Sequence, residues 1–337
     1  MYKNLFRRLY TGKYTLVSIT FFSVMQADHP KGSISSTESL AEKISLLNIS
    51  KPSSAEFGGR PLKENENPFT QNAWDNIEWT IDDTNSALDK IEVQKSRAVS
   101  DSDQLTLDSH PNKYWDKFYE SNGDKFFKDR KWLSVEFPEL FSEENTDLRV
   151  LEVGCGAGNT FFPFVDLKSH TDSFVYACDY SSQAVNLITS SPSYNPSKSH
   201  AFVFDITCLA KLDEIPENSL DFITCIFVLS AINPNTWNNA RDNLFKLLKP
   251  GGVLLIRDYG IYDMTQLRFK NGFMGDSWYK RGDGTRVYFF TNEELGELFG
   301  GKDWECLQNV MDRRLLVNRA KQLKMYRCWV QAKFKKI

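Results

Sequence analysis

A glycine-rich loop follows a strongly apolar, strand-like segment in the middle of the chain. The stretch LRVLEVGCGAGN, residues 148–159, carries Gly154, Gly156 and Gly158 at alternate positions, with Glu152 two residues before the first glycine. Because glycine has no side chain, such a loop lets a ligand come very close to the backbone. The spacing G-x-G-x-G differs from the G-x-G-x-x-G fingerprint of dinucleotide-binding proteins. The loop therefore indicates a ligand that needs close backbone contact but has no phosphate.

An acidic residue follows each of the next two predicted strands. Asp179 ends the segment VYACD, and Asp205 ends FVFD. An ionised Asp179 is suited to accept hydrogen bonds from ribose hydroxyls, and Asp205 is suited to accept one from an adenine amino group. The alternative for both residues is capping of a following helix. The glycine loop followed by two such acids is typical of proteins that bind S-adenosylmethionine, so the sequence predicts this cofactor and methyl transfer.

The end of the fourth predicted strand limits the methyl acceptor. Enzymes that methylate an exocyclic amine usually carry an Asn/Asp-Pro-Pro-aromatic loop there, but this chain reads CIFVLSAINPN. Methylation of pyrimidine carbon 5 commonly uses a Pro-Cys pair, and the chain contains none. The remaining acceptors are already nucleophilic, so that the enzyme mainly has to position two reactants.

The last third of the chain is locally basic, although the formal net charge is −3. After Asp312 there are nine Lys/Arg residues and no acid, and basic and aromatic residues alternate over residues 269–288. This pattern fits neutralisation of a nucleic-acid backbone combined with base stacking. For any single one of these residues, a solvated strand or helix face is the alternative.

Strands and helices alternate around these motifs, which predicts an α/β fold of the Rossmann-like class I methyltransferase type. We expect a seven-stranded, mostly parallel sheet that is covered on both faces and binds its ligands at the carboxyl ends of the strands. The predicted strands are 149–153, 174–178, 201–204, 220–228, 252–258, 304–317 and 325–334, and the predicted helices lie near 159–167, 181–190 and 236–248.

Three regions divide the chain. Residues 1–56 are expected to be a disordered leader and linker, 57–112 an acidic arm, and 113–337 the methyltransferase domain with N-terminal aromatic helices and an RNA-binding C-terminal part. Residues 64–108 hold eleven acids against three bases, which favours a poorly structured arm. Within it, FTQNAWDNIEW should be ordered, with both tryptophans over the rim of the substrate cleft. A passive clip on the main domain is the alternative.

The composition of the chain indicates its compartment and argues against a metal site and a membrane span. Six scattered cysteines without a CxxC pair and only four histidines argue against a zinc site and for a reducing compartment. No apolar run reaches the ~18 residues of a membrane span. We therefore expect a cytoplasmic protein without a metal. The basic, acid-free residues 1–27 keep a mitochondrial presequence open as the less favoured alternative.

Several longer motifs resemble one enzyme family, the eukaryotic tRNA methyltransferases that form 3-methylcytidine at position 32 of the anticodon loop. The resemblance runs from about residue 57 to the end, and NAWDNIEW is similar to the branch that acts on threonine tRNAs. Serine tRNAs and a need for an aminoacyl-tRNA synthetase partner stay open. The motifs are FGGRPL, NAWDNIEW, KYWDKFY, FFKDRKWLSVEFPEL, VLEVGCGAGN, ACDYS, FVLSAINP, IRDYGIYDMTQLRFK, YKRGDGTRVYFFT and VNRAKQLKMYRCWVQAKFKK.

The resemblance implies a set of site residues. Cofactor contacts fall on Trp115, Tyr119, Gly154, Asp179, Asp205, Ile206 and Ile226. Candidates for substrate RNA are Lys128, Arg130, Trp132, Arg281, Arg286, Arg319 and Arg327.

The implied chemistry needs little acid–base help. Cytosine nitrogen 3 has a free lone pair at neutral pH, so no general base is required, and positive charge develops on the base. We expect Asp258 to stabilise that charge and Tyr259 to form a wall for the base. A salt bridge is the alternative for Asp258. A catalytically silent tRNA-binding scaffold is the alternative function, and the intact Gly154, Asp179 and Asp205 argue against it.

Overall fold

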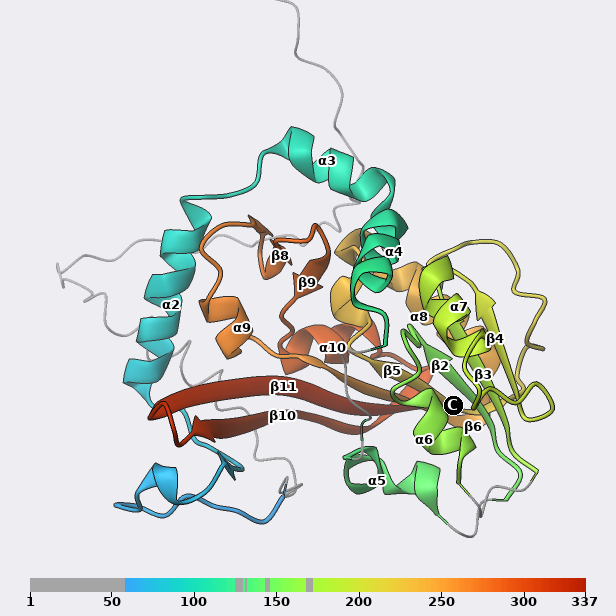
Figure 1. Cartoon of the computed structure of the whole chain (residues 1–337), viewed down its shortest axis with the longest axis horizontal. Helices are drawn as coiled ribbons and strands as arrows, with labels where there is room; N and C mark the ends of the chain where they lie inside the picture. The colour runs from blue at the N-terminus through green and yellow to red at the C-terminus, as the bar shows by residue number, and fades with distance from the viewer. Residues whose placement is uncertain (1–57, 125–129, 131, 143–145, 168–171) are drawn as a thin grey trace, which may run out of the picture. The chain divides into compact units, whose positions relative to one another are not determined.

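An eight-stranded sheet is the main element of the protein (Figure 1). The structure, a computed structural model, describes residues 58–124, 130, 132–142, 146–167 and 172–337. The strand order is β1-β10-β11-β6-β5-β2-β3-β4, parallel from β6 to β4 and antiparallel from β1 to β6. The strands are β1 (Ala73–Trp74), β2 (Arg149–Val153), β3 (Phe174–Asp179), β4 (Ser199–Val203), β5 (Leu220–Ile226), β6 (Leu248–Tyr259), β10 (Trp304–Asn318) and β11 (Leu323–Lys336).

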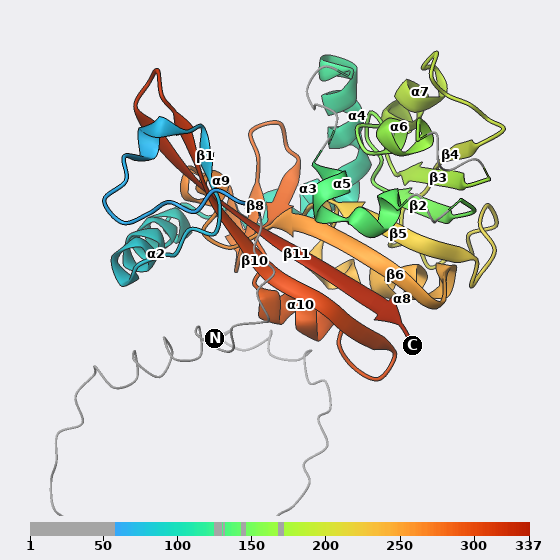
Figure 2. The same cartoon turned by 90° about the horizontal axis from the view of Figure 1, so that it is seen from below.

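The seven predicted strands are all present, and β1 adds an eighth. Helices cover both faces of the sheet: Figure 2 shows α6 (Phe161–Val165) and α7 (Ser182–Thr189) on one side and α8 (Trp237–Leu247) and α10 (Asn292–Leu298) on the other. Successive strand residues alternate between two buried cores, so that Val150 packs with the first helix pair and Leu151 with the second. A sheet buried on both faces explains why the central strands are apolar throughout.

The tryptophan-containing segment is ordered at the outer edge of the sheet. Residues Ala73 and Trp74 pair with β10 as strand β1. The Trp74 side chain is 1% exposed and packs against Leu315 and Val317. Its indole nitrogen donates to the carbonyl of Pro68 at 2.7 Å. The Trp79 ring stacks on Tyr262 with 5.7 Å between centroids.

The prediction of a poorly structured arm is wrong for much of residues 81–109, which form α2 (Ile81–Lys95) and α3 (Asp101–Ser109). The excess of acidic residues gave the wrong prediction, because a few apolar side chains are buried against the main domain. These are Ala87, Ile91 and Leu107. Caps also stabilise both helices: Thr80 forms a capping box with Asp83, and the Ser100 side chain caps α3.

Shorter elements surround the ends of the parallel strands. β7, β8 and β9 form a three-stranded antiparallel sheet. The bounds are η1 (Pro68–Thr70), α4 (Pro111–Asn122), α5 (Leu133–Glu136), η2 (Pro138–Phe141), η3 (Leu229–Ala231), η4 (Pro234–Thr236), α9 (Met264–Leu267), β7 (Phe273–Gly275), β8 (Trp278–Lys280) and β9 (Arg286–Tyr288).

The sequence predicts neither a membrane span nor a metal centre, and the described residues bear on both. None of its helices is long and apolar enough to cross a membrane. Within the same residues, no cluster of three His, Cys, Asp or Glu side chains is arranged to hold a metal ion.

Candidate active site

The glycine loop between β2 and α6 leaves no room for side chains. Gly154 and Gly156 both have positive φ angles, 61° and 53°. A Cβ atom on Gly154 would lie 2.5 Å from Val228, and one on Gly156 would lie 2.7 Å from the Tyr119 hydroxyl. Only glycine combines this conformation with such close packing. The loop is therefore shaped to bring its backbone against a ligand.

Asp179, at the end of β3, ties the glycine loop to the start of α7. Its two carboxylate oxygens accept hydrogen bonds from the backbone N–H groups of Gly156 at 3.0 Å and Ser181 at 2.9 Å. Burial raises the pKa of this carboxyl to about 6, and the two backbone bonds oppose that effect. The N-cap of α7 is Ser181. Helix capping is therefore the wrong explanation for Asp179.

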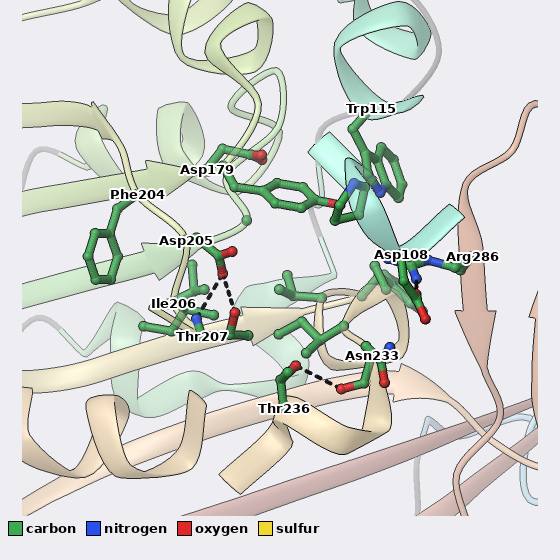
Figure 3. Close-up of a pocket in the computed structure, with 18 of the residues that line it drawn as sticks. Asp108, Trp115, Asp179, Phe204, Asp205, Ile206, Thr207, Asn233, Thr236 and Arg286 are labelled. Carbon is green, nitrogen blue, oxygen red and sulfur yellow. Dashed lines mark hydrogen bonds and ion pairs between the residues drawn. The ribbon is translucent and has the colours of Figure 1, made fainter. Parts of the chain in front are cut away.

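Asp205 lies in a turn and caps no helix. Its Oδ1 accepts from the backbone N–H of Thr207 at 2.8 Å and from the Thr207 hydroxyl at 2.7 Å, as Figure 3 shows. Residues 204–219, all of which the structure describes, contain turns and no helix. The turn holds the carboxylate at the edge of the same cavity as Asp179.

A cavity of about 340 Å³ opens beside the loop and both acids (Figure 3). Six of the seven predicted cofactor residues line it: Trp115, Tyr119, Gly154, Asp179, Asp205 and Ile206. The seventh, Ile226, lines an adjoining cavity. These residues fit S-adenosylmethionine, because Gly154, an acceptor for ribose and an acceptor for adenine line one cavity, and Gly156 of the same loop lines the adjoining one.

Arg286 lies in this cofactor cavity, where Figure 3 shows it next to Asp108. It forms an ion pair with that residue, stacks on the Trp278 ring and is only 5% exposed. This buried, paired position does not suit the predicted contact with RNA. Asp108 was not predicted, because only the packing of α3 over the cavity brings it to β9.

A second cavity of about 520 Å³ adjoins the first. The two share Trp115, Tyr119, Gly154, Phe227 and Ala231 as lining residues. Aromatic rings and guanidinium groups dominate the rest of the second cavity. Of the residues predicted for catalysis and RNA binding, five line it, namely Arg130, Trp132, Tyr259, Arg281 and Arg327.

Two other RNA candidates lie elsewhere. Arg319 is exposed in the turn that joins β10 and β11. Lys128 falls outside the described residues. Trp74 and Trp79 line neither cavity, so their predicted placement over the cleft is wrong for the buried Trp74, which acts as a clip at the sheet edge.

Asp258 lines neither cavity, which contradicts its predicted role in charge stabilisation. The residue is fully buried and accepts from the backbone N–H groups of Ser230 at 2.9 Å and Tyr259 at 2.8 Å. Burial raises its pKa to about 6. Its two bonds hold the loop after β5 and the end of β6 in place, so the structure gives it a positioning role. The predicted salt bridge is not the explanation either, since Arg257 pairs with Asp312.

Glu152 is a buried acid that lines the second cavity. It is 4% exposed, and its Oε2 has no hydrogen-bond partner among the described residues. Burial raises its pKa to about 8, and the nearby Arg130 opposes this. Arg130 donates to the carbonyl of Ile226 at 3.2 Å and lies 5.4 Å over the Phe227 ring. A buried carboxyl oxygen without a partner fits a cationic group of a bound ligand.

The far wall of the second cavity was missed by sequence reasoning. Arg257, Arg314, Trp329 and Glu136 line it, and they come from β6, β10, β11 and α5. Their convergence depends on the antiparallel register of the last three strands, in which Trp329 lies opposite Tyr259. No local sequence pattern carries that register.

Comparisons with known proteins agree with this geometry. The family profile described as a methyltransferase domain matches residues 126–309. "tRNA N(3)-cytidine methyltransferase METTL2" of Danio rerio is 45% identical, over 84% of this chain and 89% of its own. "tRNA N(3)-methylcytidine methyltransferase trm140" of Schizosaccharomyces pombe is 48% identical, over 83% of this chain and 92% of its own.

A third relative has a longer chain. The "tRNA(Thr) (cytosine(32)-N(3))-methyltransferase" of Saccharomyces cerevisiae is 47% identical over 83% of this chain, which corresponds to 45% of the yeast protein. A glycine cradle with two acids, the methyltransferase domain and relatives at this level of identity lead to one conclusion. The chain belongs to the family of tRNA N(3)-cytidine methyltransferases, enzymes of the Rossmann-like class I fold that use S-adenosylmethionine.

Proposed function

We propose that this protein transfers a methyl group from S-adenosylmethionine to nitrogen 3 of cytidine 32 in threonine tRNAs. The observation that carries the proposal is the shared wall between the two cavities. A cofactor in the first cavity and a base in the second would meet at Phe227 and Ala231. Since nitrogen 3 lies on the pairing edge of cytosine, the base has to leave the stack to enter such a cavity.

The residues around the second cavity suit a reaction that creates a cation. S-adenosylmethionine supplies an electrophilic methyl group, and cytosine nitrogen 3 supplies the lone pair. Tyr259 and Phe227, whose ring centroids are 5.0 Å apart, offer aromatic faces to the positive charge that forms on the base. Glu152 offers a carboxyl group beside them. Catalysis then rests on holding the reactants in line, with no proton to remove.

Phosphate contacts should fall on cations that have no carboxylate partner. Arg281 lines the second cavity, lies 5.8 Å over Tyr259 and donates to the carbonyl of Arg286 at 2.8 Å. No carboxylate of the described residues lies within salt-bridge distance of it. The exposed turn between β10 and β11 adds Arg319 and Lys321, and the start of β11 adds the exposed Lys324. Together these residues outline a path for the RNA backbone.

The preference for threonine tRNA rests on the tryptophan-containing segment and on the specificity in the yeast relative's name. We place the reaction in the cytoplasm and leave serine tRNAs, an aminoacyl-tRNA synthetase partner and a presequence in residues 1–27 as alternatives. Localisation of a C-terminally tagged full chain, with and without residues 1–24, separates the two compartments.

The test is methylation of separately purified threonine and serine tRNAs from cells that lack the activity. Nucleoside mass spectrometry should detect 3-methylcytidine in threonine tRNA, and a C32U transcript should yield none. Binding of both cofactor and tRNA without any product would instead support the silent scaffold.

A further inference from the structure

Trp329 stands at the centre of the far wall of the second cavity. Three strands place it there: Tyr259 of β6 and Asp312 of β10 are its register partners on either side. Directly opposed residues in antiparallel strands point to the same face of the sheet, about 5 Å apart. Trp329 is therefore the immediate neighbour of Tyr259, the proposed wall for the target base.

Planar groups surround the Trp329 ring. The guanidinium groups of Arg327, Arg257 and Arg314 lie 4.8, 5.0 and 6.0 Å from it. The Trp132 ring lies on Arg257 at 5.1 Å. Alternating aromatic and guanidinium planes are the surfaces on which unstacked bases of single-stranded RNA pack.

The indole nitrogen of Trp329 is buried and has no hydrogen-bond partner among the described residues. Buried polar groups in proteins are nearly always hydrogen-bonded, so this donor points to a ligand with an acceptor. The Trp329 residue lines the second cavity, which has a volume of about 520 Å³. Indole can only donate, which limits the partner to a carbonyl, a ring nitrogen or a phosphate oxygen.

The charges around Trp329 decide which of these acceptors fits best. Every arginine around Trp329 already has a carboxylate, and the wall with its neighbouring ion pairs holds four arginines and four acids. The pairs are Arg257–Asp312, Arg314–Asp312, Arg314–Glu136, Arg314–Asp75, Arg60–Asp75 and Arg327–Asp263. A neutral wall with a donor and stacking planes favours a nucleobase carbonyl over a phosphate.

We propose that Trp329 forms a subsite for a second nucleobase, that of a nucleotide flanking the target cytidine in the same RNA loop. The indole N–H donates to a carbonyl at the edge of this base, and the guanidinium planes of the neighbouring arginines pack against its face. The inference rests on the proposed function for the identity of the RNA. It makes Trp329 a residue that positions the substrate and reads its neighbouring base.

Trp329→Phe tests the subsite, because it removes the donor and keeps an aromatic ring. The substrates are an anticodon stem-loop and two versions with an abasic site on the 5′ or the 3′ side of the target. On the intact stem-loop, kcat/KM should fall about five- to tenfold, as expected for one hydrogen bond. On one of the two abasic RNAs, wild type and variant should be equal. The affinity for S-adenosylmethionine should not change.

An equal loss on all three RNAs, or no loss on the intact one, would overturn the proposal and leave Trp329 a structural residue. The matched control is Trp237→Phe. In the wild type, the Trp237 indole donates to the Leu229 carbonyl at 3.1 Å, and Trp237 lines neither cavity. Its effect should not depend on the abasic site. Fluorescence anisotropy with the same RNAs repeats the comparison without turnover. Absence of 3-methylcytidine with wild type would refute the proposed function instead.

Discussion

Replacement of Asp179 by Asn is the sharpest test of the cofactor cavity. Each carboxylate oxygen of Asp179 already accepts one backbone N–H, from Gly156 or Ser181. An ionised carboxylate has about four acceptor sites, so roughly two remain for the ribose hydroxyls. Asn removes the charge and one of the acceptor oxygens. We expect weaker cofactor binding.

The magnitude follows from these two bonds. A hydrogen bond to a charged group contributes about 1.5–3 kcal/mol, and a neutral one about 0.5–1.5 kcal/mol. Losing one charged bond and converting the other to a neutral one costs about 2–4 kcal/mol. The Kd of Asp179→Asn should therefore rise roughly 30- to 1000-fold.

The pH dependence gives a second, independent readout. Burial raises the pKa of Asp179 in the free protein to about 6. The ionised form is the one that we propose to bind ribose. Wild-type affinity should therefore fall as pH drops through 6, by about tenfold between pH 7.5 and pH 5. The cofactor affinity of Asp179→Asn should not show this decrease at low pH. For the cofactor-free fold the sign is opposite: a raised carboxyl pKa contributes stability below its unfolded value, which is lost as pH rises through about 6.

Calorimetric titration with S-adenosylmethionine at both pH values measures both effects. Asp116→Asn is the matched control, because Asp116 accepts from the Ser181 hydroxyl at 2.7 Å but lines neither cavity. This variant should bind S-adenosylmethionine normally at pH 7.5. The pH at which its affinity is half lost should be lower than in wild type, because the Asp116 charge raises the pKa of Asp179. Unchanged affinity in Asp179→Asn, or the same pH profile as wild type, would refute the assignment.

Three further predictions concern the RNA path, the base wall and the sheet edge. Changing the exposed residues Arg319 and Lys321 of the β10–β11 turn and Lys324 at the start of β11 to Gln should reduce the log–log salt slope of tRNA binding by roughly 0.7–0.9 for each phosphate that is no longer neutralised. Cofactor affinity should not change, and an unaltered slope places the RNA elsewhere. Tyr259→Leu should lower kcat for 3-methylcytidine formation at least about tenfold while Tyr259→Phe stays near wild type, and equal rates for all three would remove the ring from the mechanism. Trp74→Ala should lower the free energy of unfolding by about 3–5 kcal/mol in urea titrations, because a large buried side chain is removed, whereas a decrease below about 1 kcal/mol would show that β1 is dispensable.

The structure gives two predicted residues roles other than the expected ones, because burial and ion pairing are properties of the fold. Arg286 and Asp258 both stand in promising sequence contexts, yet one is paired with Asp108 and the other is bound to backbone N–H groups. Whether a charged residue is free for a substrate depends on partners that are distant in sequence. Asp108 and Ser230, which supply these contacts, lie on other elements.

The sequence by itself determined the parallel part of the sheet and the grouping of the predicted cofactor residues at its edge. Apolar runs, helix periodicity and the glycine loop are local signals, and parallel strands bring their carboxyl ends together at one edge. Gly154, Asp179 and Asp205 could therefore be placed around one ligand without a structure.

Only the tertiary structure decided the second cavity and the fate of the N-terminal arm. The wall around Trp329 depends on the antiparallel register of β6, β11 and β10, and a shift of one residue would turn every one of its side chains to the other face. Helices α2 and α3 form because a few apolar residues find a surface to cover. Both outcomes come from contacts between distant segments, whose energies no local pattern encodes.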